Sequence, residues 1–277
     1  MAQIIFRPGV PGALPAALLV KPDGTTAAPS VLAIHGLNRE TELMAKLLAK
    51  QSDAAGRSVI LPIFDRKFWP RYQRATCKDR SDWALLALLQ VLRDEGWIGA
   101  ELPDMSGFSG GAQFAHRFAW LYPEHVARLC LVAPGWWTFP DTRGAYPLAI
   151  GMDGSVGSAP TFRLKANLPK FLDRQIIVRV GELDITRDKN LRQHPDVMAQ
   201  QGANRVERAR NWTAAAIRAA RQLGVSQRVD FALMKDCGHS FADCVANGGL
   251  ASVFVPKSLK SEEARLPRCH GQIEEVA

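Results

Sequence analysis

The chain has 277 residues, of which 47% are hydrophobic and 22% charged, and its formal net charge is +8. This composition predicts an ordinary soluble globular protein with a sizeable core, and one domain over residues 1–277 is favoured over two. No apolar run approaches the length of a membrane-spanning helix and the N-terminus lacks a signal-peptide pattern, so we expect a cytoplasmic protein without a membrane partner.

Apolar runs of strand length alternate with helical patterns in the first half of the chain. The apolar run at 12–20 is short and broken by Pro15, which suits a strand. Ser81 is expected to cap a helix that stops at Gly96. The remaining elements expected here are strands at 29–36 and 58–64 and helices at 39–56 and 81–96.

The alternation continues in the second half, after a helix that ends at Pro123. Continuous Val, Ile and Leu runs separated by helices predict an α/β fold with a mostly parallel central sheet and helices on both faces. The expected parts are strands at 127–135, 175–184 and within 229–241, a helix at 205–222, a loop-rich stretch or small cap at about 136–173, and a polar C-terminal tail at about 256–277.

The stretch SGFSGG, residues 106–111, contains the pattern G-x-S-x-G around Ser109. A strand that runs into a helix through glycines forces the residue between them into an unfavourable backbone conformation. The side chain of Ser109 is then expected above the sheet at a helix N-terminus, where free N–H groups and the helix dipole favour a developing anion. This pattern predicts a nucleophile on a sharp turn.

A serine nucleophile needs a base to take its proton and a carboxylate to orient that base. The segment DCGHSF places His239 just beyond the last strand, and VGELD places Asp184 at the end of the strand before it. Catalytic groups of parallel sheets gather at the carboxyl ends of the strands. Asp236 and Asp141 stay open as alternative acids. Ser109, Asp184 and His239 follow the chain order Ser, Asp, His.

The segment HGLN, residues 35–38, follows the first strong strand and can direct a backbone N–H toward the same point. We expect the N–H groups of Leu37 and Gly110 to form an oxyanion hole. His35 is interpreted as a structural hydrogen-bonding residue, and His116 as a packing or surface residue.

With these motifs, the chain resembles the α/β-hydrolase superfamily over roughly residues 15–250. Within it, GFSGGAQFAHRFAWLYPEHV and VGELD are most similar to bacterial polyhydroxybutyrate-depolymerase-like and feruloyl-esterase-like proteins. The resemblance implies that Ser109 is the nucleophile, Asp184 the acid and His239 the base. It implies a carboxylesterase-like serine hydrolase with a small-molecule ester substrate and an acyl-enzyme intermediate. A peptidase, a thioesterase and a non-catalytic ligand-binding protein of the same fold are the alternatives.

Two aromatic loops are expected at the same end of the sheet. Trp69 lies in one loop, and Trp136 with Trp137 in the other, so all three could line a substrate pocket. Ordinary packing between loop and core is an equal alternative. No spacing of metal ligands and no phosphate-binding or dinucleotide pattern occurs, so we expect neither a metal nor a cofactor.

The net charge of +8 raises the question of nucleic-acid binding. The densest basic stretch, residues 205–222, has arginines at helical spacing without any nucleic-acid-binding motif, and it is interpreted as the solvated face of an amphipathic helix. We therefore expect no nucleic-acid partner, and the oligomeric state is left open. The five cysteines (Cys77, Cys130, Cys237, Cys244 and Cys269) are expected to be free thiols.

Overall fold

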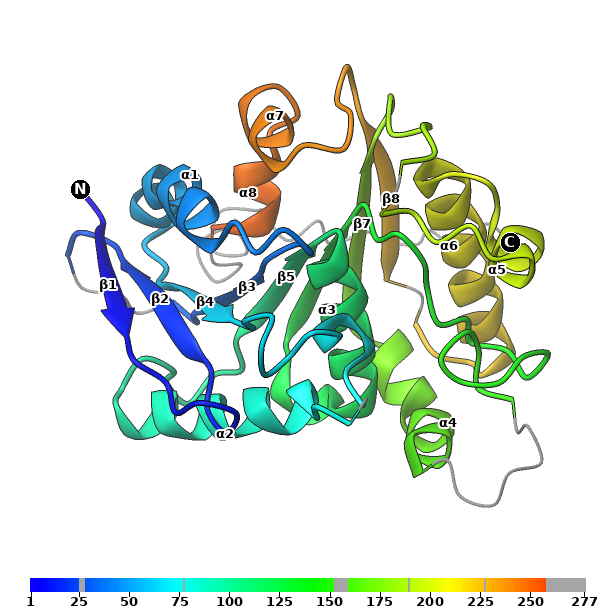
Figure 1. The fold of residues 1–277 in the computed structure, drawn as a ribbon, viewed down its shortest axis with the longest axis horizontal. Coiled ribbons are helices and arrows are strands. Elements are labelled where there is room, and N and C mark those ends of the chain that lie inside the picture. Colours follow the sequence, from blue (N-terminus) through cyan, green and yellow to red (C-terminus); the bar gives the residue numbers. More distant parts are fainter. Residues whose placement is uncertain (25–27, 77, 152–158, 189, 227, 258–277) are drawn as a thin grey trace, which may run out of the picture.

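The computed structural model describes residues 1–24, 28–76, 78–151, 159–188, 190–226 and 228–257. Within these ranges, eight strands form one sheet in the order β1-β2-β4-β3-β5-β6-β7-β8 (Figure 1). The strands are β1 Gln3–Arg7, β2 Ala16–Lys21, β3 Val31–Ile34, β4 Val59–Ile63, β5 Asp104–Phe108, β6 Arg128–Val132, β7 Gln175–Gly181 and β8 Val229–Met234.

The sheet is parallel from β4 through β3, β5, β6 and β7 to β8, and β2 pairs antiparallel with both β1 and β4. The predicted mostly parallel sheet is therefore confirmed. Strand β1 was not predicted, because it is an edge strand whose residues Gln3–Phe6 are all exposed. Its apolar run, Ile4 to Phe6, is shorter than the runs that reveal the inner strands.

Helices cover both faces of this sheet (Figure 1). One face carries α1, α7 and α8, and the other carries α2, α3, α4 and α6. Their bounds are α1 Thr41–Ala55, α2 Ser81–Asp94, α3 Gly110–Leu121, α4 Ala159–Leu172, α5 Pro195–Gln201, α6 Arg205–Gln222, α7 Phe241–Ala246 and α8 Leu250–Phe254. Because both faces are covered, β3 and β5 are buried at every residue.

Ser81 does not cap α2 as expected. The cap position is Arg80, in a left-handed conformation with φ 39°, and the helix begins at Ser81 itself. The Ser81 hydroxyl donates to the carbonyls of Tyr72 at 2.9 Å and Ala75 at 3.1 Å, so it is used to hold the preceding turn. The stop at Gly96 is confirmed, since this glycine lies just beyond the helix with φ 78°.

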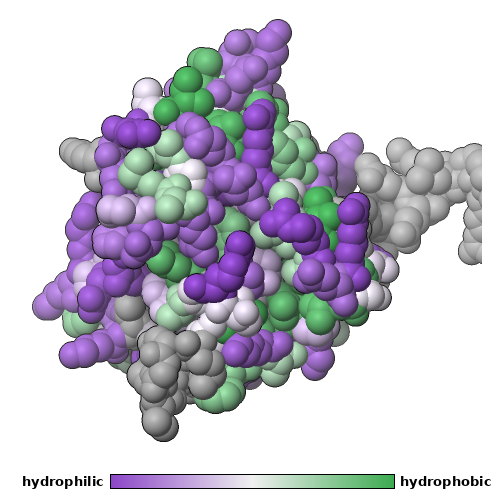
Figure 2. Space-filling view, turned by 90° about the vertical axis from the view of Figure 1, so that its right-hand side faces the viewer, coloured by the Kyte–Doolittle hydropathy of each residue, from purple (hydrophilic) through white to green (hydrophobic). Residues whose placement is uncertain are grey.

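The prediction that the arginines of residues 205–222 all lie on a solvated face is wrong for two of them. In α6, Arg205 and Arg208 are 1% and 0% exposed. Positions 205, 208 and 212 share one helix face, and this face packs inward with the buried Trp212. Arg210, Arg218 and Arg221 are exposed. Helix α6 lies on the right in Figure 1, and Figure 2 shows that this side of the molecule has mainly hydrophilic side chains with small, separated apolar areas.

The described parts of the stretch 136–173 are a loop over residues 136–151 and helix α4, which packs against α3. The indole N–H of Trp120 donates to the carbonyl of Leu164 at 2.8 Å and fixes this contact. Cys130, Cys237 and Cys244 are buried free thiols, whereas Cys77 and Cys269 lie outside the described residues. No helix in the described ranges has the length and apolar character that crossing a bilayer requires.

Candidate active site

Ser109 occupies the single position between the end of β5 and the start of α3. Its backbone has φ 54° and ψ −114°, a conformation that costs a non-glycine residue about 1–3 kcal/mol. The Ser109 N–H donates to the carbonyl of Val132 at 2.8 Å, and its own carbonyl accepts from the N–H of Gln113 at 3.2 Å. Both sides of the strained residue are thus held by backbone hydrogen bonds.

Two glycines around Ser109 are required by close backbone approaches. A Cβ atom at Gly107 would lie 2.4 Å from the carbonyl oxygen of Gly111, and one at Gly111 would lie 2.1 Å from that of Ile34. No side chain fits at either position without a shift of backbone. The glycines of the sequence motif therefore exist because strand, turn and helix are packed backbone to backbone.

The loops after β7 and β8 bring a carboxylate and an imidazole to Ser109. His239 Nε2 lies 3.0 Å from Ser109 Oγ, and His239 Nδ1 lies 2.7 Å from Asp184 Oδ2. Asp184 is 1% exposed. The two loops are fastened together, because the N–H of Leu183 donates to the carbonyl of Cys237 at 2.9 Å. This chain of contacts can pass a proton from the hydroxyl to the imidazole.

The two alternative acids, Asp141 and Asp236, contact residues other than His239. Asp141 bonds Arg143 at 2.8 Å in an exposed loop. Asp236 occupies the turn after β8 with φ 54°, and its N–H approaches Glu182 Oε2 at 3.5 Å. Of these three carboxylates, only that of Asp184 forms a hydrogen bond with the imidazole of His239.

Leu37 and Gly110, the two expected oxyanion donors, lie side by side. A Cβ atom on Gly110 would come within 2.9 Å of the Leu37 side chain. In the described part of the chain, neither N–H donates to a backbone carbonyl, and Gly110 is the first residue of α3. Arg39 fixes the Leu37 loop by donating to the carbonyls of Leu37 at 2.8 Å and Phe64 at 2.6 Å.

His35 is buried beneath this loop and carries a structural hydrogen bond, as the sequence suggested. Its Nε2 accepts from the N–H of Phe64 at 3.1 Å, and its Nδ1 lies 2.9 Å from the Gly36 carbonyl. Complete burial lowers the pKa of His35 to about 4. The ring is therefore neutral near pH 7 and suited to orient the loop.

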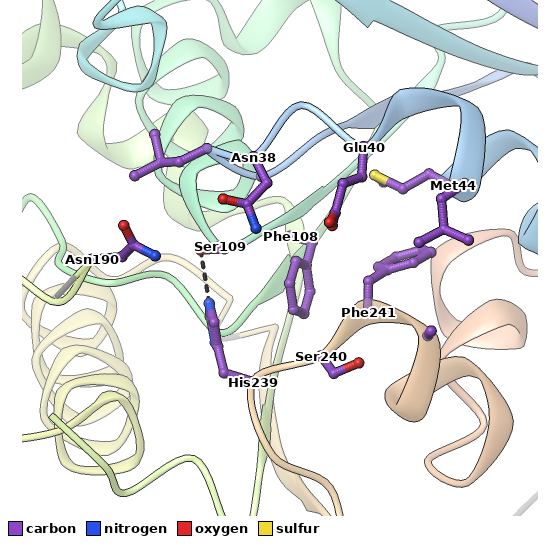
Figure 3. Close-up of a pocket in the computed structure, with 13 residues that line it drawn as sticks. Asn38, Glu40, Met44, Phe108, Ser109, Asn190, His239, Ser240 and Phe241 are labelled. Carbon is purple, nitrogen blue, oxygen red and sulfur yellow. Dashed lines mark hydrogen bonds between the residues drawn. The ribbon is translucent and has the colours of Figure 1, made fainter. Parts of the chain in front are cut away.

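A cavity of about 230 Å³ opens at Ser109 and His239. In Figure 3, the amides of Asn38 and Asn190 extend toward Ser109, and the rings of Phe108 and Phe241 lie on the side of Met44. These residues were not predicted, because they come from four separate segments whose meeting depends on the fold. A larger cavity of about 1370 Å³ lies at the amino ends of the strands, with Asp104 in its lining, and contains none of the three motif residues.

The three tryptophans considered for the pocket are buried elsewhere and do not line this cavity. Trp137 stacks on Trp212 with ring centroids 4.3 Å apart, and Trp136 lies under the guanidinium of Arg117. Trp69 packs edge-on against Phe64. Their surroundings match ordinary packing, and no described residue of the stretch 136–173 lines the cavity either. Among the described residues, no group of three or more His, Cys, Asp and Glu side chains is placed to hold a metal.

Comparison with solved structures places this architecture among known folds. A poly(3-hydroxybutyrate) depolymerase from Bordetella parapertussis has a TM-score of 0.74 at 22% identity, covering 97% of this chain and 92% of that one. A poly(aspartic acid) hydrolase from Sphingomonas sp. KT-1 has a TM-score of 0.72 at 22% identity, covering 91% and 96%. The chain has the α/β-hydrolase fold.

A more distant likeness is to an S-formylglutathione hydrolase from Agrobacterium tumefaciens, with a TM-score of 0.55 at 15% identity and 96% of each chain covered. No family model matches the chain, and no curated protein matches its sequence. The predicted α/β-hydrolase fold is confirmed, including the likeness to polyhydroxybutyrate-depolymerase-like proteins. At these identities the comparisons establish the fold, and the chemistry has to be argued from the residues of the site.

Proposed function

We propose that this protein is a serine hydrolase that cleaves a carboxylic ester through Ser109, His239 and Asp184. The observation that carries the proposal is the continuous contact from Ser109 Oγ through His239 to Asp184, with the serine on a strained turn at a helix N-terminus. Solved structures of the same fold include a poly(3-hydroxybutyrate) depolymerase and a ferulic acid esterase, which supports an ester substrate. The poly(aspartic acid) hydrolase and the S-formylglutathione hydrolase of this fold keep the amide and the thioester as alternatives.

In the proposed reaction, Ser109 Oγ attacks the carbonyl carbon while His239 Nε2 takes its proton. The N–H groups of Leu37 and Gly110 stabilise the oxyanion, and each such donor is worth about 3 kcal/mol in related reactions. His239 then gives its proton to the leaving alcohol, which leaves an acyl group on Ser109. A water molecule deprotonated by His239 releases the acid and restores the serine.

The cavity supports a small substrate. A volume of about 230 Å³ is below the range of about 300–1000 Å³ usual for drug-sized ligands, so it holds an ester with short groups or one end of a longer chain. Its lining includes the buried rings of Phe108 and Phe241, and the exposed Glu40 adds a carboxylate. We propose a short, apolar and uncharged acyl group.

Fluorophosphonate labelling followed by peptide mass spectrometry tests the proposal. The expected result is one adduct on Ser109 that is absent in Ser109→Ala and strongly reduced in His239→Ala. Turnover of p-nitrophenyl acetate should then exceed turnover of the octanoate ester. Turnover by Ser109→Ala at the wild-type rate would refute the assigned nucleophile.

Labelling and turnover together also separate the alternative functions, which are a thioesterase, a peptidase and a non-catalytic ligand-binding protein. Labelling of Ser109 with preference for thioesters or peptide amides would keep the nucleophile and replace the substrate class. A wild-type protein that is folded, is not labelled and hydrolyses none of these substrates would contradict the proposed activity and favour a ligand-binding role.

A further inference from the structure

A buried arginine lies behind the carboxylate of Asp184. Arg205, at the first position of α6, is 1% exposed, and its Nη1 donates to Asp184 Oδ1 at 3.0 Å and to Asp188 Oδ2 at 2.7 Å. The other carboxylate oxygen of Asp184 faces His239 at 2.7 Å. One guanidinium group therefore bridges two carboxylates, one of which contacts the imidazole.

The charges in this group determine how readily the imidazole holds a second proton. Asp184 and Asp188 favour the imidazolium, whereas the positive charge of Arg205 opposes it, so the three together carry a net charge of −1. Burial acts to raise the pKa of Asp188, but the hydrogen bond and charge of Arg205 and the backbone hydrogen bond from Asn190 outweigh it and hold that pKa below its usual value. Asp188 is therefore ionised near neutral pH.

We propose that Arg205 is a positioning residue for the reaction proposed above: it fixes the carboxylate of Asp184 and offsets one of the two negative charges behind the imidazole of His239. This inference rests on the proposed function. The guanidinium is held in place by burial and by Asp188, so it orients Asp184 without entering the cavity.

Other titratable groups surround His239 and are unchanged in the variants below, so their effect cancels in the comparison. The pKa of the Cys244 thiol is raised by burial to about 12, so that group is uncharged. Glu40 lines the same cavity as His239, and Glu182 approaches the N–H of Asp236. The others lie within five residues of His239 or Asp184 in the chain, and they are Arg187, Asp236, Cys237, Asp243 and Cys244.

The test compares the pH dependence of kcat/KM for Arg205→Met, Asp188→Asn and the double variant. Arg205→Met leaves two unbalanced carboxylates, so the midpoint of the acid limb should rise by about one pH unit. Asp188→Asn should lower it by about half a unit, and the double variant should return it close to the wild-type value. Arg205→Lys, which keeps the charge, should leave the midpoint close to that of the wild type.

Arg208→Met is the matched control, because Arg208 is equally buried on the same helix but donates to the carbonyls of Gly202, Gly135 and Arg192. A purely structural role for Arg205 predicts that both methionine variants lose stability and that neither moves the midpoint. Shifts of the same sign in Arg205→Met and Asp188→Asn, or no shift in either, would overturn the inference.

The test can be read even if one variant does not fold, and failure of this inference can be told from failure of the proposed function. If Arg205→Met does not fold, Asp188→Asn still predicts a downward shift, because the amide that replaces this carboxylate keeps one side-chain oxygen to accept from the N–H groups of Asn190 and Leu191. Labelling of Ser109 and ester turnover in the wild type are measured separately. If they are present while the midpoints stay fixed, the proposed function stands and the role of Arg205 fails.

Discussion

The two ends of the parallel strands each contain a buried arginine–aspartate pair, but the two pairs have different surroundings. At the amino ends, Arg57 contacts Asp104 at 2.7 Å, with Arg128 at 4.0 Å from the same oxygen. At the carboxyl ends, Arg205 contacts Asp184 at 3.0 Å. Both Arg57 and Arg205 are almost completely buried.

The difference lies in what else these groups bind. Asp104 faces two guanidinium groups, and Arg57 also donates to the carbonyls of Pro29 at 2.7 Å and Pro256 at 3.2 Å. These partners are guanidinium groups and backbone carbonyls, which are not general acids or bases. Asp184 instead directs one oxygen to an imidazole. The Arg205–Asp184 pair leaves one carboxylate oxygen to contact the imidazole of His239, so it can act in catalysis. The Arg57–Asp104 pair only connects segments of the chain.

The largest expected effect is on turnover at the carboxyl end. Asp184→Asn should lower kcat/KM for a p-nitrophenyl ester by about 10⁴-fold, because the amide misorients the imidazole and cannot stabilise its charge. Asp236→Asn is the matched control, since that residue lies in the neighbouring turn and asparagine tolerates its φ of 54°. It should retain wild-type activity. A loss below tenfold in Asp184→Asn would transfer the orienting role to another carboxylate.

The next effect is on stability at the amino end. Asp104→Asn should lower the free energy of unfolding by about 3–5 kcal/mol, because it leaves Arg57 and Arg128 buried without an anion. Urea unfolding measures this loss, and kcat/KM of the folded protein should change less than twofold. Asp230→Asn removes the partner of Arg179 from a pair whose carboxylate is 61% exposed, and it should cost below about 1 kcal/mol. Equal losses of stability in Asp104→Asn and Asp230→Asn would show that burial does not explain the difference between the Arg57–Asp104 pair and the Arg179–Asp230 pair.

The comparison also shows which features were visible in the sequence. The inner strands and Ser109, Asp184 and His239 stand next to glycines and apolar runs, which are local signals. The role of Arg205 was not visible, because its i, i+3 spacing with Arg208 fits an exposed helix face as well as a buried one. The inward face becomes clear only when Asp184 and the carbonyl of Gly135 are seen beside it.

The cavity was the least predictable part for the same reason. Asn38, Phe108, Asn190 and Phe241 belong to four segments, and no local pattern brings them together. The tryptophans were conspicuous in the sequence but fill the space between loops and helices, where large aromatic rings bury the most area.

The smallest expected effect concerns an exposed charge at the carboxyl end. Glu40 lines the cavity, and its exposed carboxylate forms no hydrogen bond or ion pair with any described residue, so its negative charge faces an arriving substrate. Glu40→Gln should raise kcat/KM for a p-nitrophenyl ester of succinate about fivefold and leave the acetate ester unchanged, as expected for two charges a few ångströms apart in a partly solvated site. Added salt should reduce the difference between the two esters.

Glu42→Gln is the matched control, on an exposed residue that does not line the cavity, and it should change the turnover of neither ester. An equal gain for both esters in Glu40→Gln would mean that the carboxylate does not distinguish charged from uncharged substrates. The proposed difference between buried charges, which hold segments together or orient a side chain, and the exposed charge of Glu40, which selects substrates, would then be wrong.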